Sequence, residues 1–377
     1  MAPSTPIPTP AVSVLLCTRD RPAALERALH SVLAGRWQDF ELLVLDQSAT
    51  AATQQVVTMA AAGDRRVRYR RMPPCGKAIA LNSGITQARG ALLAFLDDDC
   101  EAPPAWLERL VQAFAADPRL MLLVGAVVGG PHDPARGFIP TFAPARRLYG
   151  LRVLTCGDNP MGANMAMRRA LPQAIGLFDP LLGAGAPLRS SYDIAYCYRA
   201  YRLGRRICAD PTITVVHHGF RSWTEGHRLV QGYALGTAAA YTKFVRLGDP
   251  LALALLVADL SRYSLRMMRQ LLRRERPVHL TALLYRLLGI VRSYRYAVDH
   301  KTLLYVPRQP EEAVAGAGDP VARPHPAPAP VRTLIMGTEP DEMLCQGRRA
   351  GGARMLSRAG DLRAYSRIAV NFLGHLQ

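Results

Sequence analysis

Residues 91–99 read ALLAFLDDD, an apolar run of strand length that ends in three consecutive aspartates. An apolar run without polar alternation is typical of a strand that is buried on both faces of a parallel sheet. Ligands of open α/β sheets bind at the carboxyl ends of the strands, which is where these aspartates would stand. Neighbouring carboxylates repel one another unless a positive group is present. The stretch therefore has two interpretations: a bound divalent cation, or a solvated acidic turn.

The sequence on both sides of this stretch alternates apolar runs with segments of helical periodicity. We expect strands at residues 12–17, 40–45, 67–70, 91–96 and 121–128, and helices around Leu25–Leu33 and at 54–62, 77–88 and 104–116. Apolar strands that are separated by helices predict an α/β fold, in which helices cover both faces of a mostly parallel sheet.

Residues 130–159 form a Pro-, Gly- and Arg-rich connection, after which regular structure is expected again. The pattern indicates a strand at 162–167, helices at 168–176 and 190–203, and a paired-strand segment at 206–216 that ends in His217–His218. Beyond Trp223 the sequence changes to long helices.

Polar residues follow the expected strands at their carboxyl ends. Thr18 and Arg19 follow the first strand, and Asp46 follows the second. A buried aspartate needs a donor, which either a ligand or the N–H of a local turn would supply. Asp46 is therefore either a ligand contact or an Asx-turn residue.

The chain of 377 residues carries 47 Lys and Arg against 29 Asp and Glu, a net charge of +18. Nucleotide phosphates, lipid headgroups and nucleic acid are all anionic partners for such a chain. Nucleic acid is disfavoured, because aromatic residues make up only 7% and the basic residues concentrate in amphipathic helices. Seven scattered cysteines without a CxxC pair favour a reducing compartment. With neither a signal peptide nor a spanning helix expected, the predicted location is cytoplasmic.

Residues 221–305 are expected to be helical, basic and amphipathic. In residues 261–301, ten Lys or Arg face only two acids, a local charge of +8. One helical face of this segment carries four arginines: Arg262, Arg266, Arg269 and Arg273. The segment either attaches peripherally to the inner face of an anionic cytoplasmic membrane or packs on the catalytic domain as a helical hairpin. Around the folded part we expect a flexible leader at 1–10, a Pro/Ala-rich linker at 306–330 and a tail without an interpretable motif at 331–377.

Four blocks in this order, VSVLLCTRDRP, FELLVLDQS, ALNSGITQARGALLAFLDDD and GANMAMRRALPQAIGLFD, resemble the family 2 glycosyltransferases of the GT-A fold. The resemblance covers about residues 11–220, with a nucleotide-binding half at 11–130 and an acceptor half at 131–220. It implies an inverting enzyme that uses a nucleotide-diphosphate sugar, expected to be a UDP-sugar, and a divalent metal, Mn²⁺ or Mg²⁺. The implied acceptor is a glycan or a lipid-linked molecule of the bacterial cell-envelope type.

The resemblance also assigns roles on the nucleotide side. Asp97 and Asp99 match the DxD pair of the family, with Asp99 as the metal ligand and Asp97 turned toward the ribose, while Asp98 assists or is solvated. Thr18, Arg19 and Asp46 match the nucleobase pocket of the family, in which a carboxylate accepts the imide N–H of uracil. Asn82 and Gly84 match the helix that closes this pocket, or have a structural role only.

On the acceptor side, the family's acidic block corresponds to residues 192–199, where one of three acids remains. That acid, Asp193, is the expected general base, and its alternative is a first-turn residue that favours the helix dipole. Strand alternation would send one of His217 and His218 toward the metal, and His218 is the expected ligand. Asn164, Arg168 and Arg221 are the expected diphosphate or acceptor contacts, with Arg169 a further candidate.

Two other functions compete with this one. A nucleotidyltransferase on a similar fold would want a Gly-rich phosphate loop after the first strand, and CTRDRP has no glycine. A degenerate transferase that only binds sugar or nucleic acid would explain the depleted acidic block and the charge, but the intact DDD argues against it.

Overall fold

The computed structural model describes residues 9–156, 159–274 and 278–308. Most of the expected leader, and residues 309–377 of the expected linker and tail, lie outside these ranges.

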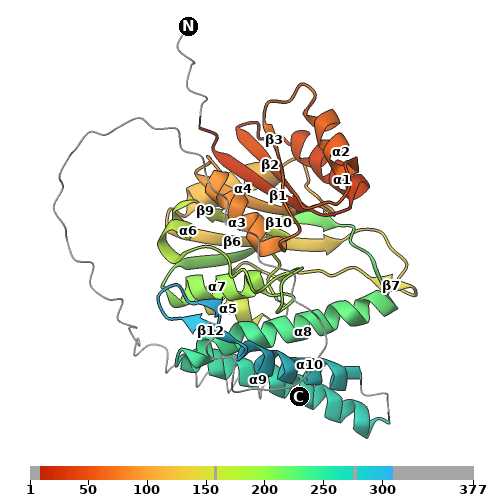
Figure 1. The fold of residues 1–377 in the computed structure, drawn as a ribbon, viewed down its shortest axis with the longest axis vertical. Helices are drawn as coiled ribbons and strands as arrows, with labels where there is room; N and C mark the ends of the chain where they lie inside the picture. Colours follow the sequence, from red (N-terminus) through yellow and green to blue (C-terminus); the bar gives the residue numbers. More distant parts are fainter. Residues whose placement is uncertain (1–8, 157–158, 275–277, 309–377) are drawn as a thin grey trace, which may run out of the picture. The chain divides into compact units, whose positions relative to one another are not determined.

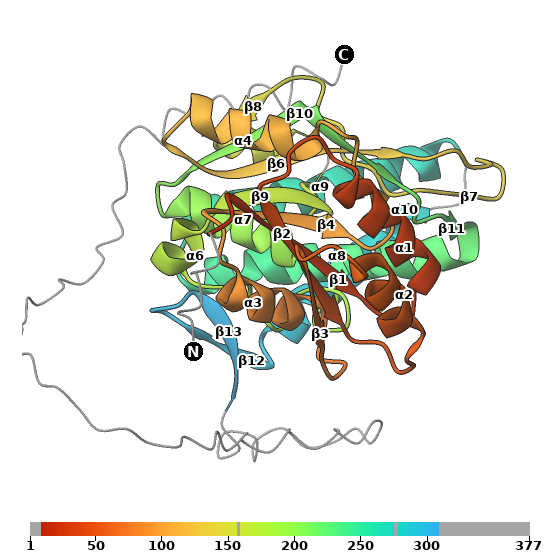
Figure 2. The ribbon, with the colours of Figure 1, turned by 90° about the horizontal axis from the view of Figure 1, so that it is seen from above.

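A central mixed sheet carries the fold (Figures 1 and 2). Its strands follow the order β3-β2-β1-β4-β9-β6-β10-β5. They are β1 (Val12–Thr18), β2 (Phe40–Asp46), β3 (Val67–Arg71), β4 (Leu92–Asp97), β5 (Cys100–Glu101), β6 (Leu120–Gly129), β9 (Asn164–Arg168) and β10 (Arg206–His217). The pairs among β1 to β4 are parallel, and so is β6 with β10, whereas β9 runs antiparallel to both of its neighbours. The expected mostly parallel α/β sheet is therefore confirmed.

Helices alternate with these strands as the periodicity predicts. They are α1 (Pro22–Leu33), α2 (Ala52–Ala61), α3 (Lys77–Gln87), α4 (Trp106–Ala116), α6 (Ala170–Ile175) and α7 (Tyr192–Arg202). In α1, Pro22 occupies the first turn, where its missing N–H costs nothing. The same helix buries Leu25, Leu29 and Val32, which recur at helical spacing.

Strand register brings the expected polar residues to one edge of the sheet. Thr18 pairs with Asp46, and Cys17 pairs with Asp97. The two-residue strand β5 turns back after the aspartates and pairs with the end of β10, which sets Cys100 opposite His217. Residues from both halves of the domain therefore meet at the carboxyl edge.

Two segments differ from the expectation. Residues 130–159 contain β7 (Gly137–Phe138), β8 (Leu148–Tyr149) and α5 (Leu151–Thr155). Each short strand is fixed by a distant partner, β11 (Arg221–Ser222) for β7 and β10 for β8, so local periodicity does not reveal it. Residues 206–217 form one strand rather than a paired segment, and its register shifts between Asp210 and Thr214.

Three long helices follow the sheet: α8 (Trp223–Arg246), α9 (Pro250–Leu272) and α10 (Val278–Ser293). Ser222 and Glu225 form a capping box at the start of α8, and Asp249 caps α9 ahead of Pro250. Helices α9 and α10 lie on the side of α8 that faces away from the sheet (Figure 1). Gly289 lets α10 approach α8 closely, since a Cβ there would lie 2.2 Å from the carbonyl oxygen of Leu235. Among the described residues, no helix has the length and apolar character needed to cross a membrane.

A hairpin of β12 (Tyr296–Asp299) and β13 (Leu304–Pro307) ends the described chain and returns to a buried ion pair. Lys243 Nζ lies 2.7 Å from Asp179 Oδ2, and both side chains are at most 2% exposed. The Tyr305 backbone N–H donates to the same oxygen, and the Tyr305 hydroxyl donates to the carbonyl of Ala239. Burial lowers the pKa of Lys243, against the attraction of Asp179. The hairpin therefore shields this pair from water.

Lys243→Ala is expected to lower the free energy of unfolding by about 3–5 kcal/mol, because the buried charge of Asp179 would lose the cation that balances it. Lys301→Ala is the matched control, since Lys301 is exposed. Urea denaturation of both variants at neutral pH measures the difference. Equal stability of the two variants would contradict the prediction.

Candidate active site

A cavity of about 840 Å³ opens at the carboxyl edge of the sheet. Its wall combines the segment after β1, the start of α3 and the three aspartates with residues 138–141, 159–163 and 183–194 and the first turns of α8. A ligand in this cavity would thus contact both halves of the domain.

The three aspartates face different partners inside the cavity. Lys77 Nζ lies 2.5 Å from Asp97 Oδ1. Arg21 Nη1 lies 3.2 Å from Asp98 Oδ1 and 2.9 Å from Asp99 Oδ2, and the Thr18 hydroxyl donates to Asp98. Burial raises the pKa of Asp98 to about 6, with the charge of Asp99 adding to the effect against Arg21. Arg21 and Lys77 therefore offset part of the negative charge of the three aspartates.

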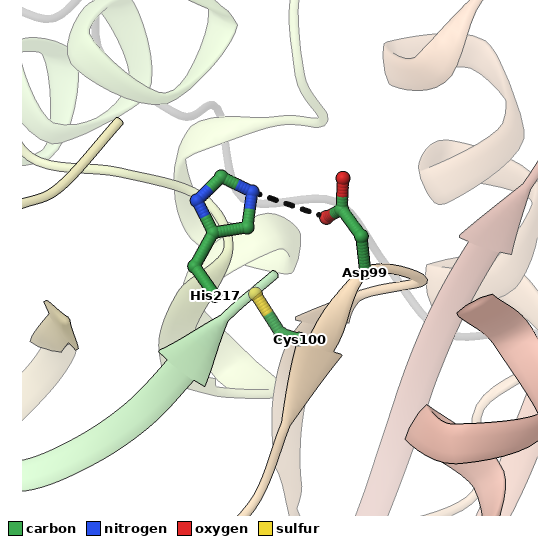
Figure 3. Close-up of side chains that lie close together, drawn as sticks. All are labelled: Asp99, Cys100 and His217. Atoms are coloured by element: carbon green, nitrogen blue, oxygen red, sulfur yellow. Dashed lines mark ion pairs between the residues drawn. The ribbon is translucent and has the colours of Figure 1, made fainter. Parts of the chain in front are cut away.

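His217 completes one side of this cluster (Figure 3). Its Nδ1 lies 2.8 Å from the carbonyl oxygen of Pro140, which assigns the ring N–H to Nδ1. Its Nε2 therefore faces Asp99 Oδ1 at 3.2 Å. Burial opposes charge on both groups, yet their mutual attraction raises the pKa of His217 and, with Arg21, lowers that of Asp99. A lone pair that faces a carboxylate is stable only with a proton or a cation nearby.

The same residues fit a divalent cation. Within the described ranges, Asp99, Cys100 and His217 are the one group of three whose ligand atoms gather within 4.8 Å. Burial raises the pKa of the Cys100 thiol, which leaves Asp99 and His217 as the effective ligands. Gly219 keeps the space beside them open, since a Cβ there would lie 2.4 Å from His217 Nε2 and 2.6 Å from Asp99 Oδ2. The carboxylate of Asp99 suits Mn²⁺ or Mg²⁺, whereas the imidazole of His217 is a less favourable ligand for these ions.

The expectation that His218 faces the site is wrong. His217 is the last residue of β10, and its register with Cys100 turns its ring toward Asp99. His218 has already left the strand: its N–H donates to the Asp99 carbonyl, and its ring lies 3.1 Å from Glu101.

Asp193 lines the same cavity. The backbone N–H groups of Gly162 and Ile194 donate to its two oxygens at 2.8 Å and 2.9 Å. Burial raises the pKa of Asp193 more than these hydrogen bonds and Lys77 lower it. The neighbouring Tyr192 hydroxyl is buried without a hydrogen-bond partner among the described residues, and Lys77 Nζ lies 5.7 Å from the Tyr192 ring centroid. Lys77 therefore pairs with Asp97 of the DDD turn and also acts electrostatically on Asp193.

Several expected site residues have structural partners instead of a place in the cavity wall. Asn82 holds the backbone of Phe178 through both atoms of its amide, and Asn164 joins Trp106 to the carbonyls of Ala126 and Ile213. Arg168 donates to the carbonyls of Leu120 and Phe114.

Of three other expected site residues, two line the cavity and one is held in a turn. Asp46 is fully buried and accepts hydrogen bonds from the Tyr69 hydroxyl and from Ser48 N–H, the Asx-turn geometry. Arg19 and Arg221 do line the cavity, and Arg221 Nη2 lies 3.7 Å from Asp99 Oδ2.

Arg21, Lys77 and Gln47 are among the cavity residues that the sequence analysis did not select. Arg21 lies in the same polar turn as Thr18, so the strand-end rule covers it. Lys77 could also have been selected from the sequence, because the chain has only three lysines and this one begins a helix at the carboxyl edge.

Comparison with known proteins agrees with this geometry. The sequence model of Glycosyl transferase family 2 matches residues 13–171. A glucosyl-dolichyl phosphate glucuronosyltransferase from Haloferax volcanii is 27% identical over 240 residues, which cover 59% of this chain and 75% of the relative. A GalNAc(5)-diNAcBac-PP-undecaprenol beta-1,3-glucosyltransferase from Campylobacter jejuni is 32% identical over 108 residues, so the match spans 27% of this chain and about a third (34%) of that relative.

A solved structure supports the same fold. A mannosyltransferase from Pyrobaculum calidifontis, in complex with GDP-Man and Mn²⁺, superposes with a TM-score of 0.52 at 19% identity and covers 76% of this chain and 87% of its own. Asp193 and His217 lie beyond the residues that the family model matches, so their roles rest on the geometry described above. The matched residues and the sheet that they build show that the chain carries a family 2 glycosyltransferase domain of the GT-A fold.

Proposed function

We propose that the chain transfers a sugar, with inversion, from a nucleoside-diphosphate donor to a lipid-linked or glycan acceptor. One observation carries the proposal: the DDD turn and Asp193 line the same cavity at the carboxyl edge of the sheet. An inverting displacement needs charge stabilisation on the leaving-group side and a base on the acceptor side.

On the donor side, Arg21 and Arg221 supply positive charge next to Asp99. Asp99 and His217 would hold Mn²⁺ or Mg²⁺, which when bound supplies Lewis-acid stabilisation of the charge that develops on the departing diphosphate. Thr18, Arg19, Asp97 and Asp98 line the cavity and remain proposed nucleotide contacts, with Gln47 added from the same wall. Asp46, the residue before Gln47, remains the proposed partner of the nucleobase, and the Asx turn is its alternative role.

On the acceptor side, Asp193 is the proposed general base. As the acceptor oxygen bonds to the anomeric carbon and the bond to the diphosphate breaks, the acceptor proton passes to Asp193. The raised pKa of Asp193 favours this role, because a carboxylate that binds its proton more tightly is the stronger base.

The relatives suggest the class of acceptor. The names of two of them contain a dolichyl phosphate and an undecaprenyl diphosphate carrier, respectively. We propose a lipid-linked acceptor on this ground, which would bring the enzyme to the inner face of the cytoplasmic membrane. The donor nucleobase is proposed to be uracil.

A thermal-shift panel of nucleoside diphosphates with and without Mn²⁺ tests the function. UDP together with Mn²⁺ is expected to raise the melting temperature more than either alone, because a ligand that binds only the folded state stabilises it. UDP-sugar hydrolysis, with water as a slow acceptor, tests transfer before the acceptor is known. A panel without any nucleotide-dependent shift would contradict the proposal.

Asp46→Ala is expected to weaken UDP binding by about tenfold or more while Mn²⁺ binding stays unchanged, because a charged hydrogen bond to the base would be lost. Tyr69→Phe is the control, since it removes the hydroxyl bonded to Asp46 and keeps the carboxylate. Calorimetry on both variants measures UDP affinity. Unchanged affinity in Asp46→Ala, or an equal loss in Tyr69→Phe, would assign Asp46 to the turn alone.

A further inference from the structure

Helices α9 and α10 each expose a row of large apolar side chains. These residues are 40–80% exposed and recur three, four or seven to eight positions apart, the spacing of one helical face. We call them the apolar face: Leu253, Val257, Leu265, Met268 and Leu272 on α9, and Leu280, Leu284, Leu287 and Val291 on α10.

The apolar face of α10 points away from the catalytic domain. The opposite side of α10 is buried, with Ala282 at 5%, Arg286 at 4% and Ser293 at 0% exposure. That side packs on α8, where Gly289 meets the backbone of Leu235. Leu284 and Val291 lie about half a turn around the helix from this contact. The apolar face is therefore not needed to hold α10 in place.

The helix pair is held together by its own contacts. Arg286 Nε lies 2.6 Å from Asp259 Oδ2, and the Gln270 side chain accepts a hydrogen bond from the His279 N–H. Asp259 and Gln270 lie on the side of α9 that is remote from Val257. In Figure 1, α9 and α10 form the outer layer of the described structure beyond α8. Apolar side chains on this outer layer need a partner that the described residues do not supply.

The pair is also strongly basic. A cavity of about 240 Å³ lies between the end of α9 and the start of α10, lined by Arg266, Arg269, Gln270, Arg273 and His279. Asp259 is the only acid in the sequences of α9 and α10, and Arg286 neutralises it. Residues 261–301 carry ten basic against two acidic residues. The partner of the apolar face therefore has to tolerate, or attract, a high positive charge.

We propose that α9 and α10 lie on the surface of an anionic phospholipid bilayer, with the apolar face entering the boundary between headgroups and acyl chains. Arginine side chains would then reach the lipid phosphates from the flanks of α9. A second copy of the chain is a poorer partner, because it would set one cluster of charge +8 against another. Nucleic acid would match the positive charge, but binding to its phosphate backbone would leave the exposed Leu and Val side chains in water. The inference goes beyond the proposed transfer reaction and does not depend on it.

Sedimentation with phosphatidylcholine vesicles, with and without phosphatidylglycerol, tests the surface on the full chain. The wild type should bind the anionic vesicles and bind the neutral ones more weakly, with binding falling as salt screens the arginines. The triple variant Val257→Gln, Leu284→Gln, Val291→Gln should bind at least about tenfold more weakly, because less apolar area leaves water. Met59→Gln on α2, whose side chain is 76% exposed, is the matched control and should bind as wild type.

A second variant tests the contribution of the arginines to vesicle binding. Arg269→Gln with Arg273→Gln should weaken binding at low salt by up to about 25-fold, about fivefold for each arginine. Arg27→Gln, an exposed arginine of α1, should have little effect. An unchanged melting temperature in every variant, measured without ligand, shows that a loss of vesicle binding does not come from unfolding.

Three results would overturn the proposal. The wild type does not bind anionic vesicles at low salt, the triple variant binds them as strongly as the wild type, or the Met59→Gln control loses as much binding as the triple variant. A fourth comes from the mass in solution without vesicles. If the wild type self-associates and the triple variant is a monomer, the apolar face is a contact between copies and not a lipid surface.

Discussion

Asp193→Asn is expected to lower sugar transfer by about 10²- to 10⁴-fold, the usual effect of losing a positioned proton acceptor. The amide has nearly the shape of the carboxylate but cannot take the proton from the acceptor hydroxyl. Nucleotide affinity should stay near that of the wild type, because Asp193 is the proposed base on the acceptor side and not one of the proposed nucleotide contacts. UDP-sugar hydrolysis measures the rate, and calorimetry measures UDP affinity.

Asp39→Asn serves as the control, since Asp39 is an exposed aspartate outside the cavity wall. The pH profile adds a second readout. The base must be deprotonated, so the rate of the wild type should fall as the pH falls through the pKa of Asp193. Because burial raises that pKa, the fall should lie above the pH range of an ordinary aspartate. If Asp193→Asn hydrolyses the donor as fast as the wild type, the base is another residue.

Asp99→Ala is expected to remove most of the gain in UDP affinity that Mn²⁺ provides, and to lower transfer by at least about 10²-fold, because Lewis-acid stabilisation is worth several kcal/mol. Glu101→Ala is the matched control: Glu101 is half exposed, lies two residues away and pairs with His218 instead of His217. Titration of UDP with and without Mn²⁺ gives the comparison. Equal UDP affinity of the wild type under both conditions would refute the metal site.

The same measurement separates the two histidines. His217→Ala should resemble Asp99→Ala, because the ring lies 3.2 Å from the carboxylate. His218→Ala should resemble Glu101→Ala.

The sequence predicts the elements of the sheet better than their pairing. Apolar runs such as ALLAFLDDD reveal buried strands, and the strand-end rule finds Thr18, Asp97, Asp98 and Asp99 at one edge. The antiparallel direction of β9 follows from contacts with β4 and β6, which no local pattern encodes. For the same reason the two-residue strands β7 and β8 were not foreseen.

In the site, too, contacts between distant residues decide what the local sequence pattern leaves open. Alternation predicts that one of His217 and His218 faces inward, but the choice depends on the Cys100–His217 register, a contact between distant residues. Asn164 and Arg168 have the right residue types for a ligand, yet backbone carbonyls within the fold engage them. A polar residue near a site is informative only when its local partners are known.

The position of Tyr305 in the chain bears on how this protein folds during synthesis. The Lys243–Asp179 pair joins α8 to the segment before α7, but Tyr305 provides the last hydrogen bonds that enclose it. Until Tyr305 has been added to the chain, these hydrogen bonds cannot form. The packing around the pair is therefore completed only after the β12–β13 hairpin has been synthesised, about sixty residues after Lys243.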